Sequence, residues 1–547
     1  MTGHLFTMLI VLSLWCSCSH SIGGAGGETT NGVITGRLVE NNELYCASVQ
    51  VSLFPAEFDP VKENAAFPDV FTDTAGQYVF SQVPQGDYSI VAADTATGSK
   101  TLITGIHIDN DTFVAPIESL QTPGTIKTFL LPGSKRSNGY VYIPGTRCHA
   151  FINTPDDFVL LDSVPAGIIP QMSYSCRDSS SSEVIRFGIR VVSSDTAVIR
   201  NPSWRYTRGL RLNTSESGAG IPVDLIHFPI LVRLTAENLD FSLAQEDGAD
   251  LRFAKTDGAM LPLEIERWDA QRKHAEVWVK IDTVHGNDSE QSITMYWGNP
   301  EAGATSNGSE VFDTADGFAG VWHLGDEIED SFRDATANQF HGVSPDTAQP
   351  LRVDGVTGYC RRFNGIDDYI VMPNTASGAL DFPEASEYTI HAWVSPDSID
   401  NASHLIVAKG HSQYFLWLTY SSANTSVWEF VEFGQSINWQ VSSPVQTISE
   451  WALLVGVRKG DQQLLFCNGT LIDSSVNKWP QAFPRDASAN MTIGRFLNGV
   501  PFMTNDGASF FKGSIDEVRI ARVAHSPEWI RLCYMNQQSD DRLIEFE

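Results

Sequence analysis

The sequence predicts an all-β protein built from several domains. Its apolar runs are short and are separated by turn residues, with 43 Gly and 26 Pro in 547 residues, and windows with helical periodicity are few. A chain of this length spans several domains and can bury ample core, so no disulfide scaffold is needed to explain its folding.

The charge of the chain excludes two classes of partner. A formal net charge of −30 at pH 7 disfavours binding to nucleic acid or to an anionic membrane surface, because both need clustered Lys and Arg. No block of like charge stands out along the sequence. We therefore interpret the acidity as a solvated surface and not as an interaction tail.

The N-terminus carries an export signal. The apolar run 5–15 is too short to span a bilayer but suits the core of a signal peptide, so residues 1–17 are predicted to be removed. The small Ser17 before Cys18 resembles a bacterial lipobox, which implies a lipidated Cys18 and an exported lipoprotein anchored at the outer membrane or cell surface. Ordinary cleavage and secretion is the alternative. Residues 18–31, rich in Gly and Thr, form a flexible tether in either case.

Residues 32–116 show short strands around two turn motifs. The turn 73–76 reads Asp-Thr-Ala-Gly, and 83–88 reads Val-Pro-Gln-Gly-Asp-Tyr. Both motifs resemble those of the carboxypeptidase-regulatory-like, transthyretin-like β-sandwich, a module that usually serves as a spacer. No nucleophile, metal-ligand set or acid pair lies in this segment, so a structural role is expected.

Residues 117–200 contain a weaker copy of the same pattern. The stretch 156–167 parallels 75–86, including the strand and the Val-Pro-x-Gly turn, with an insertion of one residue. The repeat predicts a second, degenerate β-sandwich.

Residues 201–314 follow a different pattern. The stretches 250–253, 261–268, 275–280 and 295–300 look like the family DUF2341, a domain of unknown function that commonly precedes a jelly-roll lectin domain. Glu264 and Glu266 lie on one face of a predicted strand. Because Arg267 is adjacent and no second acid motif follows, we interpret them as solvated or salt-bridged surface.

The closing strand of the chain, residues 511–520, places a carboxylate on an apolar face. A period of two places Asp516 on the same face as Val518 and Ile520, opposite Ile515 and Glu517. An unpaired buried carboxylate is costly, so Asp516 needs backbone donors, a cation or a metal ion.

The same strand carries a family resemblance for residues 315–547. Together with four other motifs it is similar to the laminin-G-like, concanavalin A-like lectin/glucanase jelly roll, which implies two antiparallel sheets and a role in carbohydrate binding or adhesion. Four tryptophans could stack on sugar rings, although burial in the core is the alternative for each. The motifs lie at 363–370, 388–394, 451–469 and 492–495, and the tryptophans are Trp417, Trp428, Trp439 and Trp479.

The turn 334–338 resembles a motif near the start of such jelly rolls and suggests a metal site. Asp334 and Asn338, together with Asp516, could supply oxygens to one structural Ca²⁺. The alternative is that Asp334 caps its turn and Asp516 accepts backbone hydrogen bonds.

No catalytic residues are predicted, and the chain is not expected to be an enzyme. In the acidic run 326–330, Glu327 and Glu329 share a face, but Ser331 follows them, which disfavours the paired acids of a glycoside hydrolase. The remaining alternatives to a lectin are a polysaccharide-degrading enzyme and a purely structural surface component.

The cysteines allow one disulfide in each half of an exported chain. Cys360 precedes an early jelly-roll strand and Cys533 follows the closing one, so this pair is the first choice. Three connectivities remain open for each trio of cysteines: Cys46, Cys148 and Cys176 in the first half, and Cys360, Cys467 and Cys533 in the second.

Overall fold

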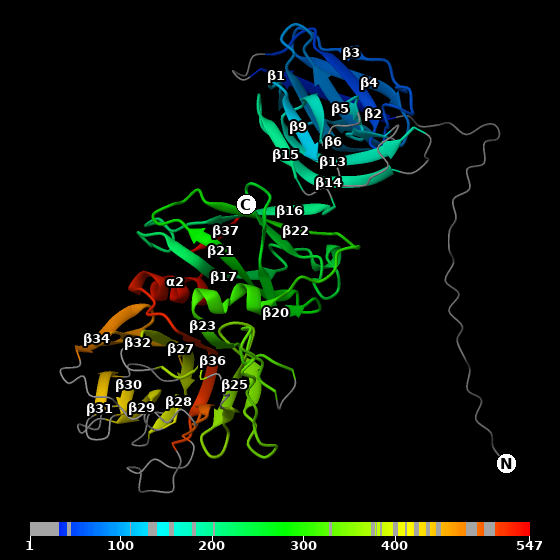
Figure 1. The fold of residues 1–547 in the computed structure, drawn as a ribbon. Helices are drawn as coiled ribbons and strands as arrows, with labels where there is room; N and C mark the ends of the chain where they lie inside the picture. Colours follow the sequence, from blue (N-terminus) through cyan, green and yellow to red (C-terminus); the bar gives the residue numbers. More distant parts are fainter. Residues whose placement is uncertain are drawn as a thin grey trace, which may run out of the picture.

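The computed structural model is nearly all β, as the sequence predicts (Figure 1). The predicted signal peptide, the predicted lipidation site Cys18 and the predicted tether lie outside the residues it describes. No helix among the described residues is long and apolar enough to cross a membrane. The structure describes residues 32–40, 45–109, 111–129, 139–152, 158–177, 182–200, 203–327, 331–373, 378, 380–382, 386–397, 403–410, 413–420, 426–433, 438–444, 450–476, 489–496 and 509–547.

Two small β-sandwiches form the N-terminal part of the molecule. In the first, β4-β1-β7, with β8 also paired to β1, faces the sheet β3-β2-β5-β6. In the second, β11-β10-β13-β14 faces β12-β9-β15. The strands of the first are β1 (Gly32–Val39), β2 (Gln50–Pro55), β3 (Val70–Phe71), β4 (Gln77–Val83), β5 (Gly86–Ala93), β6 (Lys100–Ile108), β7 (Thr112–Val114) and β8 (Glu118–Ser119). Those of the second are β9 (Gly124–Phe129), β10 (Gly139–Tyr142), β11 (His149–Phe151), β12 (Phe158–Val164), β13 (Gly167–Cys176), β14 (Ser182–Val191) and β15 (Thr196–Ile199).

The two sandwiches repeat the same topology. β1 pairs antiparallel with β4 and parallel with β7, and β9 pairs in the same way with β12 and β15. β4 and β12 share the same order of buried and exposed residues, and each has a left-handed residue near its end, Gln82 and Ser163. The internal repeat read from the sequence therefore corresponds to a repeated strand arrangement.

The third domain is a sandwich of a five-stranded and a three-stranded sheet. The sheets are β19-β18-β22-β16-β37 and β17-β21-β20. The elements before the fourth domain are β16 (Tyr206–Leu212), β17 (Leu225–Thr235), η1 (Phe241–Leu243), β18 (Arg252–Lys255), β19 (Met260–Leu261), β20 (Leu263–Asp269), β21 (His274–Val284), β22 (Ser292–Trp297), α1 (Gly308–Val311) and η2 (Thr314–Asp316).

The fourth domain stacks two large antiparallel sheets. We call β24-β25-β36-β27-β32-β33-β34, with β23 paired to β36, the interdomain sheet, and β26-β35-β28-β29-β30-β31 the outer sheet. The elements are β23 (Phe318–Trp322), β24 (Leu351–Asp354), β25 (Tyr359–Asn364), β26 (Ile370–Met372), β27 (Tyr388–Pro396), β28 (His404–Lys409), β29 (Tyr414–Tyr420), β30 (Ser426–Phe433), β31 (Asn438–Pro444), β32 (Ala452–Lys459), β33 (Gln462–Cys467), β34 (Thr470–Val476), β35 (Met491–Ile493), β36 (Lys512–Ala521), α2 (Pro527–Gln537) and β37 (Ile544–Phe546).

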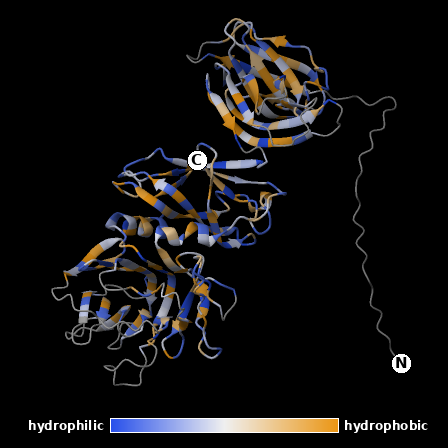
Figure 2. Cartoon of the chain, in the orientation of Figure 1, coloured by the Kyte–Doolittle hydropathy of each residue, from blue (hydrophilic) through white to orange (hydrophobic). Residues whose placement is uncertain are grey.

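The third and fourth domains share one hydrophobic core. A single cluster joins Phe228 and Trp278 of the third domain to Trp393 and Val455 of the interdomain sheet and to Trp529 of α2. Apolar and polar residues alternate along many of these strands (Figure 2). After α2 the chain returns to the third domain, where β37 pairs with β16, so its end lies beside that sheet (Figure 1).

The cysteines are not joined in the structure. All six in the described ranges are free, including the buried Cys360 and Cys533. The predicted Cys360–Cys533 disulfide is therefore not formed. Cys533 is a core residue of α2, whereas Cys360 lies on β25. Each thiol is buried and has a raised pKa.

Candidate functional site

A cleft of about 1020 Å³ opens where the third and fourth domains meet. Its lining comes from β20, from the segment after β23 and from the start of β25. It includes the aromatic side chains of Trp268 and Tyr359 and the titratable groups of Glu264, Glu266 and His323. The cleft therefore joins residues that are far apart in the sequence.

Two β-bulges position carboxylates here, Glu266 in the lining of the cleft and Glu517 behind it. In β20, the register against β21 shifts between Ile265 and Arg267, which makes Glu266 the extra residue. In β36, the register against β27 shifts near Glu517, whose backbone is left-handed with a φ of 49°. Bulges of this kind redirect side chains at sheet edges and functional sites.

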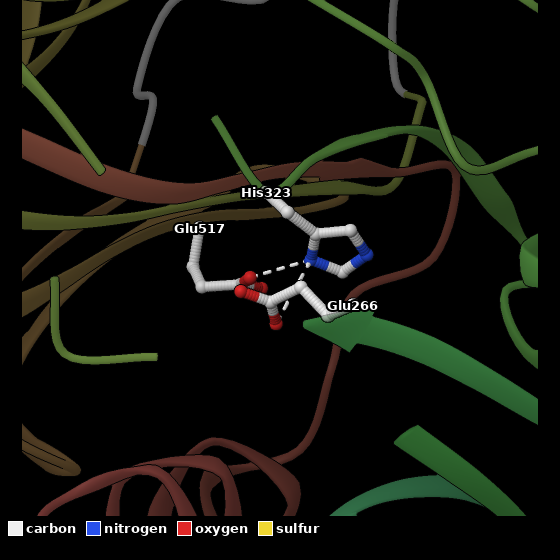
Figure 3. Close-up of side chains that lie close together, drawn as sticks. All are labelled: Glu266, His323 and Glu517. Atoms are coloured by element: carbon white, nitrogen blue, oxygen red, sulfur yellow. Dashed lines mark hydrogen bonds and ion pairs between the residues drawn. The ribbon is translucent and has the colours of Figure 1, made fainter. Parts of the chain in front are cut away.

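Glu266, His323 and Glu517, which we call the interdomain cluster, converge from three segments (Figure 3). His323 Nδ1 lies 2.5 Å from Glu517 Oε1 and 3.7 Å from Glu266 Oε2. Its other nitrogen, Nε2, lies 3.2 Å from Glu264 Oε2. The imidazole is thus held between carboxylates on both sides.

The cluster is held by further donors and rings. Arg519 donates to Glu517 Oε2 through Nε at 2.9 Å and also through Nη2. Trp278 stacks on the His323 ring and donates its Nε1–H to Glu266 Oε2 at 2.8 Å. The hydroxyl of Thr357 lies 3.1 Å from Glu517 Oε1 and 3.4 Å from Glu266 Oε1. These contacts therefore fix the orientation of the three side chains of the cluster.

Burial and charge set the protonation of these groups in opposite directions. Burial raises the pKa of Glu266 to about 8, although His323 lowers it. Burial acts the same way on Glu517, but His323 and Arg519 outweigh it and lower the Glu517 pKa to about 2. For His323, burial opposes the charge, yet Glu517 and Glu264 raise its pKa well above the usual range.

This arrangement can hold a positive charge or exchange protons with solvent in the cleft. Side chains of Glu264 and His323 remain 17% and 11% exposed, whereas Glu517 is 1% exposed and lies behind the imidazole. Glu517 orients His323 as a carboxylate orients a catalytic or metal-binding histidine. Glu266 is not solvated surface, because its side chain is only 3% exposed. The salt-bridged alternative agrees with its position 3.7 Å from His323 Nδ1.

The bulge in β36 also corrects the predicted faces of the closing strand. Ile515, Val518 and Ile520 all point into the core between the two sheets. Asp516 and Glu517 instead turn toward the third domain. The period of two fails because Glu517 adds one residue to the strand, which changes the alternation on either side of it.

Asp516 and Asp334 occupy separate hydrogen-bond networks. Asp516 Oδ2 accepts from the amides of Val356 and Thr357 at 2.8 and 3.1 Å. Asp334 accepts from three amides of its own turn and β23, and Asn338 donates to a β23 carbonyl. Among the described contacts, no residue takes part in both networks. The Ca²⁺ site shared by Asp334, Asn338 and Asp516 stays a prediction.

The four candidate tryptophans have different environments. Trp428 and Trp439 are buried, at 4% and 7% exposure, and neither is available in this structure to stack on a sugar. Trp479 lies outside the described residues. Trp417 is partly exposed on the side of the outer sheet that faces away from the third domain, beside Phe415 and Phe496.

Trp417 belongs to a small polar set that we call the outer-sheet patch. Its Nε1–H donates to Glu429 Oε2 at 2.8 Å, and Gln440 Nε2 donates to Glu429 Oε1 at 3.4 Å. Burial raises the pKa of Glu429. The patch therefore combines an aromatic face, a carboxylate and the exposed amide of Gln440 on neighbouring strands.

Asp326 and Glu327 of the acidic run line the cleft but lie apart from the interdomain cluster in their contacts. Asp326 is paired with Arg333 at 2.5 Å, and the Glu327 side chain is 88% exposed. Residues 328–330, which include Glu329, lie outside the described part of the chain. Sequence reasoning missed His323 and the role of Glu517, because no spacing in the sequence connects them to Glu266.

Comparison with known families identifies two of the four domains. Residues 364–531 match the concanavalin A-like lectin/glucanases superfamily, and residues 247–325 match the domain of unknown function DUF2341. Both agree with the resemblances seen in the sequence, and the interdomain cluster takes residues from each. No curated protein is a significant match to the chain.

Solved structures resemble only part of the molecule. The binding domain of Paraclostridial mosquitocidal protein 1 matches with 14% identity and a TM-score of 0.32, covering 40% of this chain and 52% of that one. Domain 4 of an extracellular arabinanase from Geobacillus stearothermophilus, in complex with arabinotriose, matches with 18% identity and a TM-score of 0.30, covering 39% and 97%. The botulinum neurotoxin serotype D ligand-binding domain, in complex with N-acetylneuraminic acid, matches with 11% identity and a TM-score of 0.32, covering 40% and 50%. The chain thus spans about half the length of the two toxin domains.

Proposed function

We propose that this protein binds carbohydrate through the outer sheet of its fourth domain. The observation that carries the proposal is the match of residues 364–531 to the concanavalin A-like lectin/glucanases superfamily. The outer-sheet patch supports it, because an aromatic face suits the apolar side of a sugar ring, and a carboxylate and an amide can bind its hydroxyls.

The position of the third domain favours the outer sheet over the interdomain sheet. Trp393, Leu453 and Val455 of the interdomain sheet are buried in the core shared with the third domain. A glycan has no access to side chains in that core. Trp417 and Gln440 are at least partly exposed on the opposite side of the sandwich.

The proposed role is binding without hydrolysis. A retaining or inverting glycosidase needs two carboxyl groups placed across the scissile bond. The outer-sheet patch offers Glu429 alone, and the glutamates of the interdomain cluster are engaged by His323, Trp278 and Arg519. These contacts support a lectin over the alternative of a polysaccharide-degrading enzyme.

We further propose that the protein is exported and anchored at the cell surface by a lipid on Cys18, where it mediates adhesion. The apolar run 5–15 and the small residue before Cys18 support this assignment. Mass spectrometry of the membrane fraction should find a diacylglyceryl group on an N-terminal Cys18. A soluble mature chain that starts at another residue would contradict the anchor.

A glycan array probed with the purified full chain tests the binding function. We expect selective binding to one class of glycan, with no release of reducing sugar when the bound glycan is incubated with the protein. Release of reducing sugar would favour the enzyme instead. Binding to no glycan would favour a structural surface component.

A further inference from the structure

We propose that Glu266, His323 and Glu517 bind one divalent transition-metal ion, such as Zn²⁺, at the junction of the third and fourth domains. This inference is independent of glycan binding. It assigns a role to the DUF2341 match, residues 247–325, which holds Glu266 and His323 and would share the ion with Glu517 of the lectin-like match.

The donor atoms are of the types that such an ion binds, and they lie close together. One imidazole nitrogen and a carboxylate oxygen from each of two glutamates all lie within 4.8 Å of one another. Within the described ranges, this is the one group of His, Cys, Asp and Glu with that property. A mixed nitrogen and oxygen set suits Zn²⁺ and its first-row neighbours, whereas Ca²⁺ prefers oxygen alone.

The charges around His323 favour a divalent cation. With the imidazole neutral, as a ligand must be, the cluster contributes the carboxylates of Glu266 and Glu517. Its neighbours Glu264 and Arg519 add a third carboxylate and one guanidinium. Three negative charges against one positive charge leave an excess of two negative charges, which one divalent ion balances.

A second buried carboxyl group, that of Asp516, lies next to this excess of negative charge. Asp516 is 0% exposed, and its Oδ1 is buried without a hydrogen-bond partner, although Oδ2 is well bonded. Asp516 interacts electrostatically with Glu517 and Glu266, and its Oδ2 accepts from the amide of the same Thr357 whose hydroxyl lies between those two glutamates. A cation in the cluster would stabilise this unpartnered oxygen as well.

The ligands are already oriented and reachable. Trp278 and Thr357 contact Glu266, Arg519 holds Glu517, and Glu264 holds the far nitrogen of the His323 ring. Such partners fix ligand geometry in metal sites. His323 and Glu266 also line the cleft, which gives the ion a path from solvent.

Metal binding displaces protons from the ligands. His323 Nδ1 and Glu517 Oε1 share a hydrogen bond of 2.5 Å in the structure. When the ion binds, this proton leaves to solvent through the cleft, as does the proton of a protonated Glu266 carboxyl, and the two atoms separate to accommodate an ion about 2.0–2.2 Å from each. No oxidation or reduction is involved.

Zinc retention by the full chain tests the proposal. The protein is stripped with EDTA, incubated with ZnCl₂ and desalted, and the metal content and melting temperature are measured. We expect about one zinc per chain and a higher melting temperature, because a ligand that binds only the folded state stabilises it. X-ray absorption should show one nitrogen and several oxygen neighbours. A chain that retains no zinc, or zinc bound by sulfur, would overturn the proposal.

Variants that each replace one proposed ligand locate the ion. Glu266→Gln and His323→Gln should each lose the retained zinc and the rise in melting temperature. Glu327→Gln is the matched control, because Glu327 lines the same cleft with an 88% exposed side chain, and it should keep both. Circular dichroism identifies the variants that fold, and equal zinc retention by a folded Glu266→Gln or His323→Gln would contradict the assigned ligands.

Discussion

Each sheet of the fourth domain carries a buried glutamate on its outward side, and the two are held in opposite ways. Glu517, on the interdomain sheet, is paired with His323 and Arg519, and its pKa is lowered. Glu429, on the outer sheet, accepts hydrogen bonds from Trp417 and Gln440, and its pKa is raised. Among the described residues, Glu429 has no ion pair.

The difference separates a carboxylate whose charge is paired with cations from one that can accept hydroxyl donors of a sugar. A buried charge with two cations has its partners already and stabilises the junction between domains. A buried carboxylate with neutral donors and a partly exposed neighbour still has capacity for hydroxyl donors.

The largest loss of stability is expected when Glu517 is replaced. Replacing it with alanine leaves Arg519 and His323 buried without their common carboxylate, and breaking a buried pair typically costs about 3–5 kcal/mol. Urea denaturation of the Glu517→Ala variant should show a loss of this size in the free energy of unfolding.

The matched control for Glu517 is Glu545. It pairs with Arg211 at 2.5 Å, but both side chains are about 40% exposed, at 42% and 39%. Such a pair contributes about 0–1 kcal/mol, so Glu545→Ala should change stability little. Similar losses in the two variants would remove the distinction between buried and exposed pairs on which the comparison depends.

Most of the fold could be predicted from the sequence. Regular alternation and turn residues gave the all-β class, and the spaced motifs gave the jelly roll and the DUF2341-like domain. The face of Asp516 was predicted wrongly, because a bulge of one residue at Glu517 is a property of the pairing with β27 and leaves no signal in the strand itself.

The candidate site was harder to predict than the fold. Glu266, His323 and Glu517 come from three segments, and only the shared core of two domains brings them together. Trp417 was among the predicted residues, but nothing in the sequence separated it from Trp428. Their difference lies in which side of the outer sheet each strand position faces.

The interdomain side should also be sensitive to acid. His391 is buried and His525 is partly buried, with Nε2 of His391 3.1 Å from Nδ1 of His525, and desolvation of its ring lowers the His525 pKa to about 3. Because the unfolded chain takes up the proton near pH 6.5, this contribution to stability is complete above that pH and falls as the pH decreases toward 3. Melting temperatures measured across this range should fall more steeply for the wild type than for His525→Gln.

His107 provides the control for the acid effect. It is exposed, with a side chain 64% accessible, and pairs with Asp87 on the first sandwich. His107→Gln should keep the slope of the wild type. An unchanged slope in His525→Gln would show that the buried histidine pair does not govern the response to acid.

The smallest effect on stability is expected at Glu429. Its raised pKa means that burial disfavours the charged form, so a neutral glutamine should fit without loss and keep the hydrogen bond from Trp417. The Glu429→Gln variant should melt at or slightly above the wild-type temperature at neutral pH. A large decrease, like that expected for Glu517→Ala, would mean that Glu429 is also a structural carboxylate.

The central claim, that the outer sheet binds carbohydrate, is tested most directly by titrating the glycan selected on the array into two variants of the full chain. Trp417→Ala removes the aromatic face of the outer-sheet patch and should weaken binding about tenfold, or ~1–2 kcal/mol. Glu327→Gln changes the interdomain cleft and should bind like the wild type. Unchanged affinity in a folded Trp417→Ala, together with a loss in Glu327→Gln, would place the sugar in the cleft and contradict the account.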